Sequence, residues 1–153
     1  MSMAEHVELL DLGVIWEPNA PDATLLARDD GTVVLALRAH PDDEDQRCVV
    51  LVWAGAQSAS MAAPNDEAIS GHRLIDKGLR QILWAGVVVE SQLTDQMERQ
   101  NRVHPSHDSS RFDLLKHHVV LLKECTVEVL ATSVKLERRS ASTAQAMLAA
   151  LAT

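Results

Sequence analysis

The sequence predicts a single α+β domain, covering residues 1–153, built on a mainly antiparallel β-sheet that is curled or arranged as a sandwich. The length of 153 residues fits one domain with a core of its own. The first half contains short apolar segments separated by polar turns and has no helix-sized crossover, which disfavours a parallel βαβ fold. Two later segments, near 91–103 and 141–152, carry helix-capping signals, so two helices are expected to pack on the sheet.

Strands in the first half are predicted from apolar runs and from the turn residues between them. The sequence Asp29-Asp30-Gly31 is a strong hairpin signal, because glycine accepts the positive φ that a tight turn requires. Residues 64–80 are rich in turn-forming residues and are expected to form an ordered loop. The strands expected before that loop are 7–16, 23–28, 32–39, 47–54 and 58–62.

Strands and helices alternate after the loop. A strand is predicted over 81–90, and Ser91 then caps a helix that has Leu93 and Met97 on one apolar face and is stopped by Pro105. Strands 117–123 and 126–136 follow, joined by a tight turn.

The last segment matches a capping box, formed by Ser142 with Gln145. The core-facing side of this helix is predicted from a stripe of four apolar residues, namely Ala144, Met147, Leu148 and Leu151.

Charge and composition exclude some classes of function. The net charge is −8, and residues 1–67 contribute 13 acids and 3 bases. A nucleic-acid binder needs a basic face, so that class is disfavoured. No run approaches the roughly 20 apolar residues that span a bilayer, and no secretion signal is visible, so we expect a cytoplasmic protein without membrane contact. Cys48 and Cys125 are expected to be free thiols in this reducing compartment.

The run Ala-His-Pro-Asp-Asp-Glu at 39–44 is the first motif that suggests chemistry. It resembles the metal-binding signature of the LmbE-like zinc deacetylases, in which His and carboxylate side chains bind zinc. That family places the motif before a Gly-rich segment and a helix, whereas here the chain continues directly into another strand. We therefore interpret 39–44 as a solvated acidic hairpin turn.

A second group of polar residues follows the first predicted helix. Imidazole and carboxylate groups at this density suit a ligand site or a metal site, although polar loops also use such residues to satisfy their own backbone. Strand geometry directs His117 and His118 to opposite faces, and the sequence leaves open which one faces the core. The candidate binding residues here are Asn101, His104, His107, Asp108, Arg111 and His118.

A third candidate lies in the 64–80 loop, where His72 and Arg73 stand near several carboxylates. Loops of this kind often carry function, but these residues equally suit local ion pairing.

Residues 64–131 resemble a family of small uncharacterised bacterial proteins, mainly actinobacterial. The shared pattern has two parts: GHxL…GL covers residues 71–79, and NxVHPxHD covers residues 101–108. The resemblance implies no activity, but it includes both loops and so implies a joint site.

The sequence supports two hypotheses about function. The leading hypothesis is a small binding or protein-interaction module, of an accessory or immunity-like kind, with no cofactor and no metal. The alternative is a small His-dependent enzyme, with or without a metal ion, that acts on an anionic small molecule. A protein partner, a small anionic ligand and a homodimer all remain open at this point.

Overall fold

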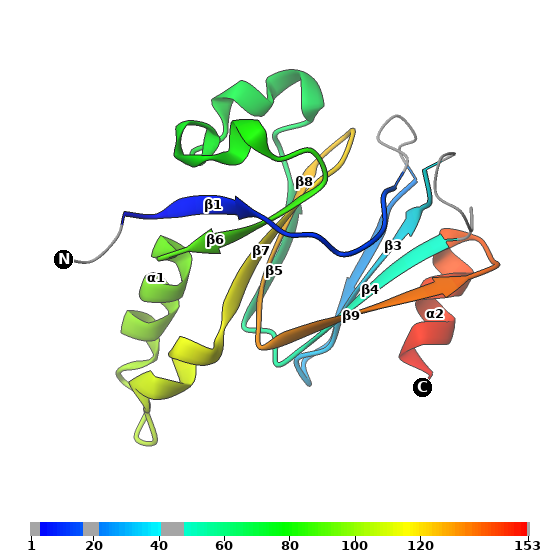
Figure 1. Cartoon of the computed structure of the whole chain (residues 1–153). Helices are drawn as coiled ribbons and strands as arrows, with labels where there is room; N and C mark the ends of the chain where they lie inside the picture. The colour runs from blue at the N-terminus through cyan, green and yellow to red at the C-terminus, as the bar shows by residue number, and fades with distance from the viewer. Residues whose placement is uncertain (1–3, 17–21, 41–47, 153) are drawn as a thin grey trace.

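The computed structural model describes residues 4–16, 22–40 and 48–152. Within these ranges the chain forms two antiparallel sheets with helices on their outer faces (Figure 1). The predicted α+β class is confirmed, and of the two expected arrangements the sandwich is the one found. Among the described residues, no helix has both the length and the apolar composition that crossing a membrane requires.

The nine strands of the described chain divide into a five-stranded and a four-stranded sheet. The five-stranded sheet has the order β1 (His6–Leu9), β6 (Ala85–Val89), β7 (Lys116–Leu121), β8 (Thr126–Ala131) and β5 (Ser58–Ala62). The four-stranded sheet has the order β2 (Thr24–Ala27), β3 (Val33–Arg38), β4 (Cys48–Ala54) and β9 (Ser133–Arg139). The helices are α1 (Gln92–Asn101), α2 (Thr143–Leu151) and four short 3₁₀ segments, η1 (Asp66–Gly71), η2 (Ile75–Lys77), η3 (Leu79–Gln81) and η4 (Ser109–Leu114).

The main core lies between the two sheets. Alternate residues of β3 and β4, such as Leu35, Leu51 and Trp53, meet Val127 and Val129 of β8 there. The other faces of β3 and β4 are covered as well, which explains why both strands read as continuous apolar runs in the sequence.

Helix α2 covers the outer face of the four-stranded sheet (Figure 1). Its capping box is present, and Met147 and Leu151 of the predicted core stripe pack on the sheet. The stripe is wrong at Ala144 and Leu148, which are exposed, because Ala146 and Ala150 take the buried positions. Small alanine side chains let the helix approach β3 and β4 closely, and this close approach decides the rotation of the helix.

A shared corner joins the two sheets. Strand β4 continues into β5, and β8 continues into β9, so both strand pairs pass from one sheet to the other near Gly55 and Thr132. The backbone N–H and the hydroxyl of Thr132 both donate to the carbonyl of Ala54, at 3.0 and 2.9 Å. The single strand predicted over 126–136 is therefore wrong, because Thr132 turns the chain between two strands.

The remaining boundaries follow local chemistry. The hairpin at Gly31 and the Ser91-capped helix are confirmed. The strand predicted over 7–16 ends at Leu9, because the Asp11 carboxylate accepts the N–H of Gly13 in a local turn. The loop predicted over 64–80 is ordered as η1 to η3, and the strand predicted from 81 begins at Ala85.

We expect Gly55→Ala to destabilise the protein through the corner. Gly55 has a φ of +65°, and an added Cβ would lie 2.4 Å from Oγ1 of Thr132. The left-handed backbone and the clash together should cost about 2–3 kcal/mol in the free energy of unfolding, measured by urea denaturation.

Gly13→Ala is the matched control, because Gly13 has a φ of +72° and no heavy atom within 4 Å of an added Cβ. It should cost only the backbone part, about 1 kcal/mol. Adding Thr132→Ala to Gly55→Ala should recover part of the loss. Equal losses for Gly13→Ala and Gly55→Ala would show that the corner is not sterically tight.

Candidate functional site

A polar groove runs between α1 and β5 along the outer face of the five-stranded sheet. Three hollows lie along it, each lined by residues of α1, and we call them together the α1–β5 groove. Its wide end has a volume of about 500 Å³, its middle about 420 Å³ and its narrow end about 350 Å³. The wide end and the middle share Gln57, Asn101, His104 and Phe112. Each hollow falls in the volume range of ligand sites, roughly 300–1,000 Å³.

Helix α1 supplies one wall of the groove. Gln92, Gln96 and Gln100 recur at every fourth residue, so their amides form a row on one side of the helix. Leu93 and Met97, predicted to form the apolar face of this helix, are half-buried and line the groove beside these amides. The apolar stripe of α1 thus borders a cavity that a ligand can fill.

Four of the residues singled out in the sequence line the wide end, namely Asn101, His104, Asp108 and Arg111. Asp108 caps η4, and hydrogen bonds from the side chain and the N–H of Ser110 hold the pKa of its carboxyl below the ordinary value. Nδ1 of His104 accepts the N–H of Ser106, so the opposite ring nitrogen is the one that carries the proton in the neutral ring. The Arg111 side chain is 79% exposed, and its Nε lies 4.0 Å from the Asp108 carboxylate.

His107 holds this loop in place and does not line the groove. Its two ring nitrogens contact Oδ1 of Asn101 at 2.8 Å and Oε1 of Glu98 at 3.1 Å, and its ring packs against Phe112. Glu98 also receives both a hydrogen bond and an ion pair from Arg102, and the hydrogen bond from Arg102 is the main reason that its pKa is lowered. The loop is thereby tied to the last turn of α1.

The narrow end of the groove contains Glu128, a carboxylate backed by two buried imidazoles. Nε2 of His117 donates to Oε1 of Glu128 at 2.8 Å, and Nε2 of His72 lies 3.5 Å from Oε2. Nδ1 of His72 accepts the N–H of Leu74, which places the proton of the neutral ring on the nitrogen facing Glu128. The hydrogen bond from His117 lowers the pKa of Glu128, so this side chain is charged at neutral pH.

Ser91, His117 and Glu128 form a hydrogen-bonded series whose composition matches a catalytic triad. The Ser91 hydroxyl lies 2.7 Å from Nδ1 of His117 and also accepts the N–H of Thr94 as the helix cap. Both Ser91 and His117 are buried, and neither lines the hollow beside Glu128. The series therefore fixes the start of α1 to β7 and β8, and it orients the Glu128 carboxylate.

Glu5 holds the same end of α1 from the other side. Its Oε2 accepts the N–H of Gln92 at 2.7 Å, and its Oε1 accepts hydrogen bonds from Arg73 at 2.8 Å and Lys77 at 2.9 Å. Burial raises the pKa of Glu5, but these three donors outweigh burial and lower it to about 2. Arg73, a candidate from the sequence, is positioned by this carboxylate at the rim of the narrow end.

His117 and His118 are both buried, on opposite faces of the five-stranded sheet. His118 lies between the sheets, where its Nδ1 accepts the indole N–H of Trp53 at 2.9 Å. His117 lies on the opposite face, beneath the cover formed by η1 to η3 and α1. His118 is therefore a core residue and takes no part in the groove.

The two loops that the sequence joined into one site lie apart. His72 and Arg73 contact Glu128 and Glu5 near the start of α1, whereas His104 and Arg111 lie beyond its end. Figure 1 shows the 66–81 segment and the 101–111 loop at opposite ends of the five-stranded sheet. The two loops line different hollows, with Arg73 at the narrow end and His104 and Arg111 at the wide end.

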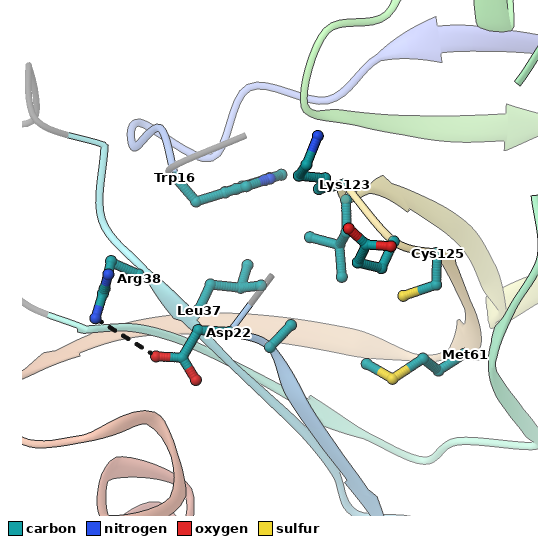
Figure 2. Close-up of a pocket in the computed structure, with 10 residues that line it drawn as sticks. Trp16, Asp22, Leu37, Arg38, Met61, Lys123 and Cys125 are labelled. Atoms are coloured by element: carbon teal, nitrogen blue, oxygen red, sulfur yellow. Dashed lines mark ion pairs between the residues drawn. The ribbon is translucent and has the colours of Figure 1, made fainter. Parts of the chain in front are cut away.

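A smaller cavity of about 130 Å³ opens between the ends of the two sheets (Figure 2). Met61, Cys125 and Leu37 line its wall, and an ion pair between Arg38 and Asp22, at 3.7 Å, lies at its rim. Burial raises the pKa of Cys125, which makes its thiol a poor nucleophile. This cavity is well below the usual size of a ligand site, so the groove is the better candidate.

The zinc-deacetylase-like run at 39–44 falls largely outside the described residues, since only Ala39 and His40 of it are described. Ala39 forms a bridge with Trp16, and the His40 ring contacts Trp84 edge to face. Within the described ranges, no group of three or more His, Cys, Asp or Glu side chains is arranged to hold a metal ion.

Several residues that line the groove were not predicted from the sequence. The four-residue spacing of the glutamines on α1 was a readable signal, because it places three amides on one helix face. Glu128, Ser58 and Ser60 had no such signal, since single polar residues that alternate with apolar ones look like any solvent-facing side of a strand.

Comparison with known proteins assigns this chain neither a family nor a function. No family model matches this chain, and comparison with curated proteins and with solved structures also yields no match. The bacterial family suggested by the 64–131 pattern stays a prediction.

We predict that Glu5→Gln lowers the free energy of unfolding at pH 7 by about 3 kcal/mol, the equivalent of the lowered pKa. Because the pKa of Glu5 is lowered from 4.5 to about 2 in the fold, its contribution is present above pH 4.5 and is lost as the pH falls toward 2. Urea denaturation at pH 7, 4 and 3 should show the wild type and the variant converging.

The control is Glu8→Gln on the same strand, because Glu8 is exposed and pairs only with the half-buried His6 among the ion pairs of the described residues. It should change the stability by less than about 1 kcal/mol. A difference in the free energy of unfolding between the wild type and Glu5→Gln that stays the same at all three pH values would show that the charge of Glu5 does not stabilise the fold.

We predict that His118→Asn flattens the pH dependence of stability. Burial, followed by the neighbouring His117 and Lys116 charges, lowers the pKa of His118 from 6.5 to about 4. The unfolded chain therefore binds a proton that the fold does not, and the wild type loses up to about 3 kcal/mol as the pH falls from 6.5 to 4.

Asparagine keeps an acceptor for the Trp53 indole but does not titrate. Denaturation curves at pH 7 and 4.5 test this. A wild type and a variant that lose the same stability between these two values would show that His118 is not the titrating group.

Proposed function

We propose that this chain is a small, non-enzymatic binding module that holds an anionic ligand in the α1–β5 groove. The observation that supports this most directly is the wide end of about 500 Å³, which Arg111 and His104 line together with the apolar side chains of Phe112, Leu114 and Leu115. A ligand site of this type combines apolar lining with a few polar groups that fix orientation.

The charges at the wide end favour a ligand that has a carboxylate or a phosphate. Arg111 presents a planar guanidinium whose geometry matches two oxygens of such a group. Its pairing with Asp108 at 4.0 Å is long, so Arg111 has little to lose when it turns to a ligand. His104 adds an N–H donor on the same side.

The alternative of a His-dependent enzyme has less support from the geometry. Four of the described histidines are used in other ways: His107 holds the loop, His118 lies in the core, and His72 and His117 orient Glu128. The metal-assisted version finds no ligand set within the described ranges. The remaining groove residues are better suited to binding a ligand than to catalysis.

The setting that we propose for this module is the cytoplasm, without membrane or nucleic-acid contact. The free thiols of Cys48 and Cys125 are compatible with a reducing compartment. A protein partner that presents the anionic group in a flexible segment is the most suitable source of the ligand, since the three hollows follow α1 from its first residue to its last.

The test uses a pool of random pentapeptides that all end in glutamate. Wild-type protein should bind the pool, and backbone amide shifts in ¹H–¹⁵N spectra should move at residues 101–115 and 55–57. Arg111→Gln should weaken binding about tenfold, which corresponds to the loss of one charge-assisted hydrogen-bond pair.

Arg80→Gln is the matched control, because Arg80 is also an exposed arginine paired with a carboxylate, that of Asp76. It should bind the pool like the wild type. Absence of binding by the wild type, or equal weakening by both substitutions, would refute the proposed site.

A further inference from the structure

The narrow end of the groove is lined by two opposite charges that do not pair with each other. Glu128 reaches it from β8, and Arg73 reaches it from the loop between η1 and η2. The Glu128 carboxylate has its ion pairs with His72 and His117. Arg73 has its ion pair with Glu5. A carboxylate and a guanidinium that line one hollow without pairing can each bind a ligand group of the opposite charge.

One oxygen of the Glu128 carboxylate has no hydrogen bond from the described chain. Oε1 accepts the N–H of His117 at 2.8 Å. The contact of Oε2 with Nε2 of His72 is 3.5 Å long, which exceeds the usual range of an N–H···O hydrogen bond. The Glu128 side chain is charged, 23% exposed and lines the hollow. An ammonium group in the hollow would therefore form a charge-assisted hydrogen bond with it.

Arg73 has donors left for a second anion. Its Nη1 donates to the Glu5 carboxylate at 2.8 Å, and within the described ranges its Nε and Nη2 make no hydrogen bond. The Arg73 side chain is 44% exposed and lines the hollow, whereas that of Glu5 is 3% exposed and does not. A guanidinium has five N–H donors, so Arg73 can keep its contact with Glu5 and also bind a ligand carboxylate.

The other described residues that line this hollow are uncharged, and all but Leu93 are polar. Hydroxyl and amide groups both donate and accept hydrogen bonds, so they suit a ligand whose remaining groups are polar and neutral. The volume of about 350 Å³ is near the lower limit of ligand sites, roughly 300 Å³, so the ligand is small. The polar side chains are those of Ser58 and Ser60 on β5 and of Gln92 and Gln96 on α1.

We propose that the narrow end of the α1–β5 groove binds a free α-amino acid with an uncharged polar side chain, its ammonium group at Glu128 and its carboxylate at Arg73. A simple anion would be repelled by Glu128, and a simple amine would be repelled by Arg73. A zwitterion satisfies both charges. This inference goes beyond the anion site at the wide end, because no described residue lines both hollows.

The test titrates ¹⁵N-labelled protein with L-glutamine, N-acetyl-L-glutamine and L-glutamine amide. L-Glutamine should shift the backbone amides of residues 58–62, 92–96 and 128 in a saturable manner. Acetylation removes the ammonium group and amidation removes the carboxylate. Each change should weaken binding about tenfold, which is the effect of losing one charge-assisted hydrogen bond. L-Leucine should bind about fivefold more weakly than L-glutamine, because its side chain forms no hydrogen bond.

Two variants assign the charges to the two side chains. Glu128→Gln should lose the preference for L-glutamine over its N-acetyl derivative, and Arg73→Gln should lose the preference over the amide. The matched controls are Glu124→Gln, at an exposed position between β7 and β8, and Arg80→Gln, which removes an exposed arginine. Both controls should keep both preferences. Because the derivatives are compared on the wild type, the test stands even if a variant folds poorly.

The outcomes separate this inference from the proposed function. L-Glutamine that shifts none of these amides, or that binds no more tightly than its two derivatives, overturns the inference. Shifts confined to residues 101–115 also overturn it, because they assign the amino acid to the wide end. Arg111→Gln should bind L-glutamine like the wild type, and a loss of that binding would contradict a separate site. A wild type that binds L-glutamine as expected but no pentapeptide supports this inference and refutes the proposed function alone.

Discussion

The corner at Gly55 and Thr132 is the constraint on which the rest of the structure depends. Two strand pairs, β4–β5 and β8–β9, bend there together, and the carbonyl of Ala54 takes both donors of Thr132. The two sheets are therefore joined at this corner, and the main core lies between them. The same corner lines the wide end of the groove, since Gly55 and Thr132 both contact that hollow. The main core and the candidate site therefore both depend on this corner.

Helix α1 is attached to this framework by polar contacts at its two ends and not by packing along its length. None of its residues is buried. Glu5 and the Ser91–His117 contact hold its first turn, while Glu98 and Asn101 hold its last turn against the His107 loop. This manner of attachment leaves the side of the helix with Leu93, Met97 and the glutamines open. A helix that packed its apolar stripe onto the sheet would have closed the groove.

The histidines illustrate how little the type of a residue says about its use. The sequence grouped His104, His107 and His118 because they are close along the chain, and the structure gives them three different roles, in the groove, in the loop and in the core. His72 and His117 are 45 positions apart and yet share one carboxylate. Backbone geometry determines this pairing, because β7 and β8 place His117 and Glu128 on one face and η1 brings His72 over them.

Features that depend on local chemistry could be predicted from the sequence. These are the hairpin at Gly31, the two capped helices, the apolar strands β3 and β4, and the loop residues Asn101, His104, Asp108 and Arg111. Each depends on turn geometry, capping or side-chain periodicity over a few neighbours. Tertiary structure alone decided the break at Thr132, the rotation of α2, the burial of both His117 and His118, and the place of Glu128 in the groove. In each of these the partner is distant in the chain, and no local pattern records which face another element will cover.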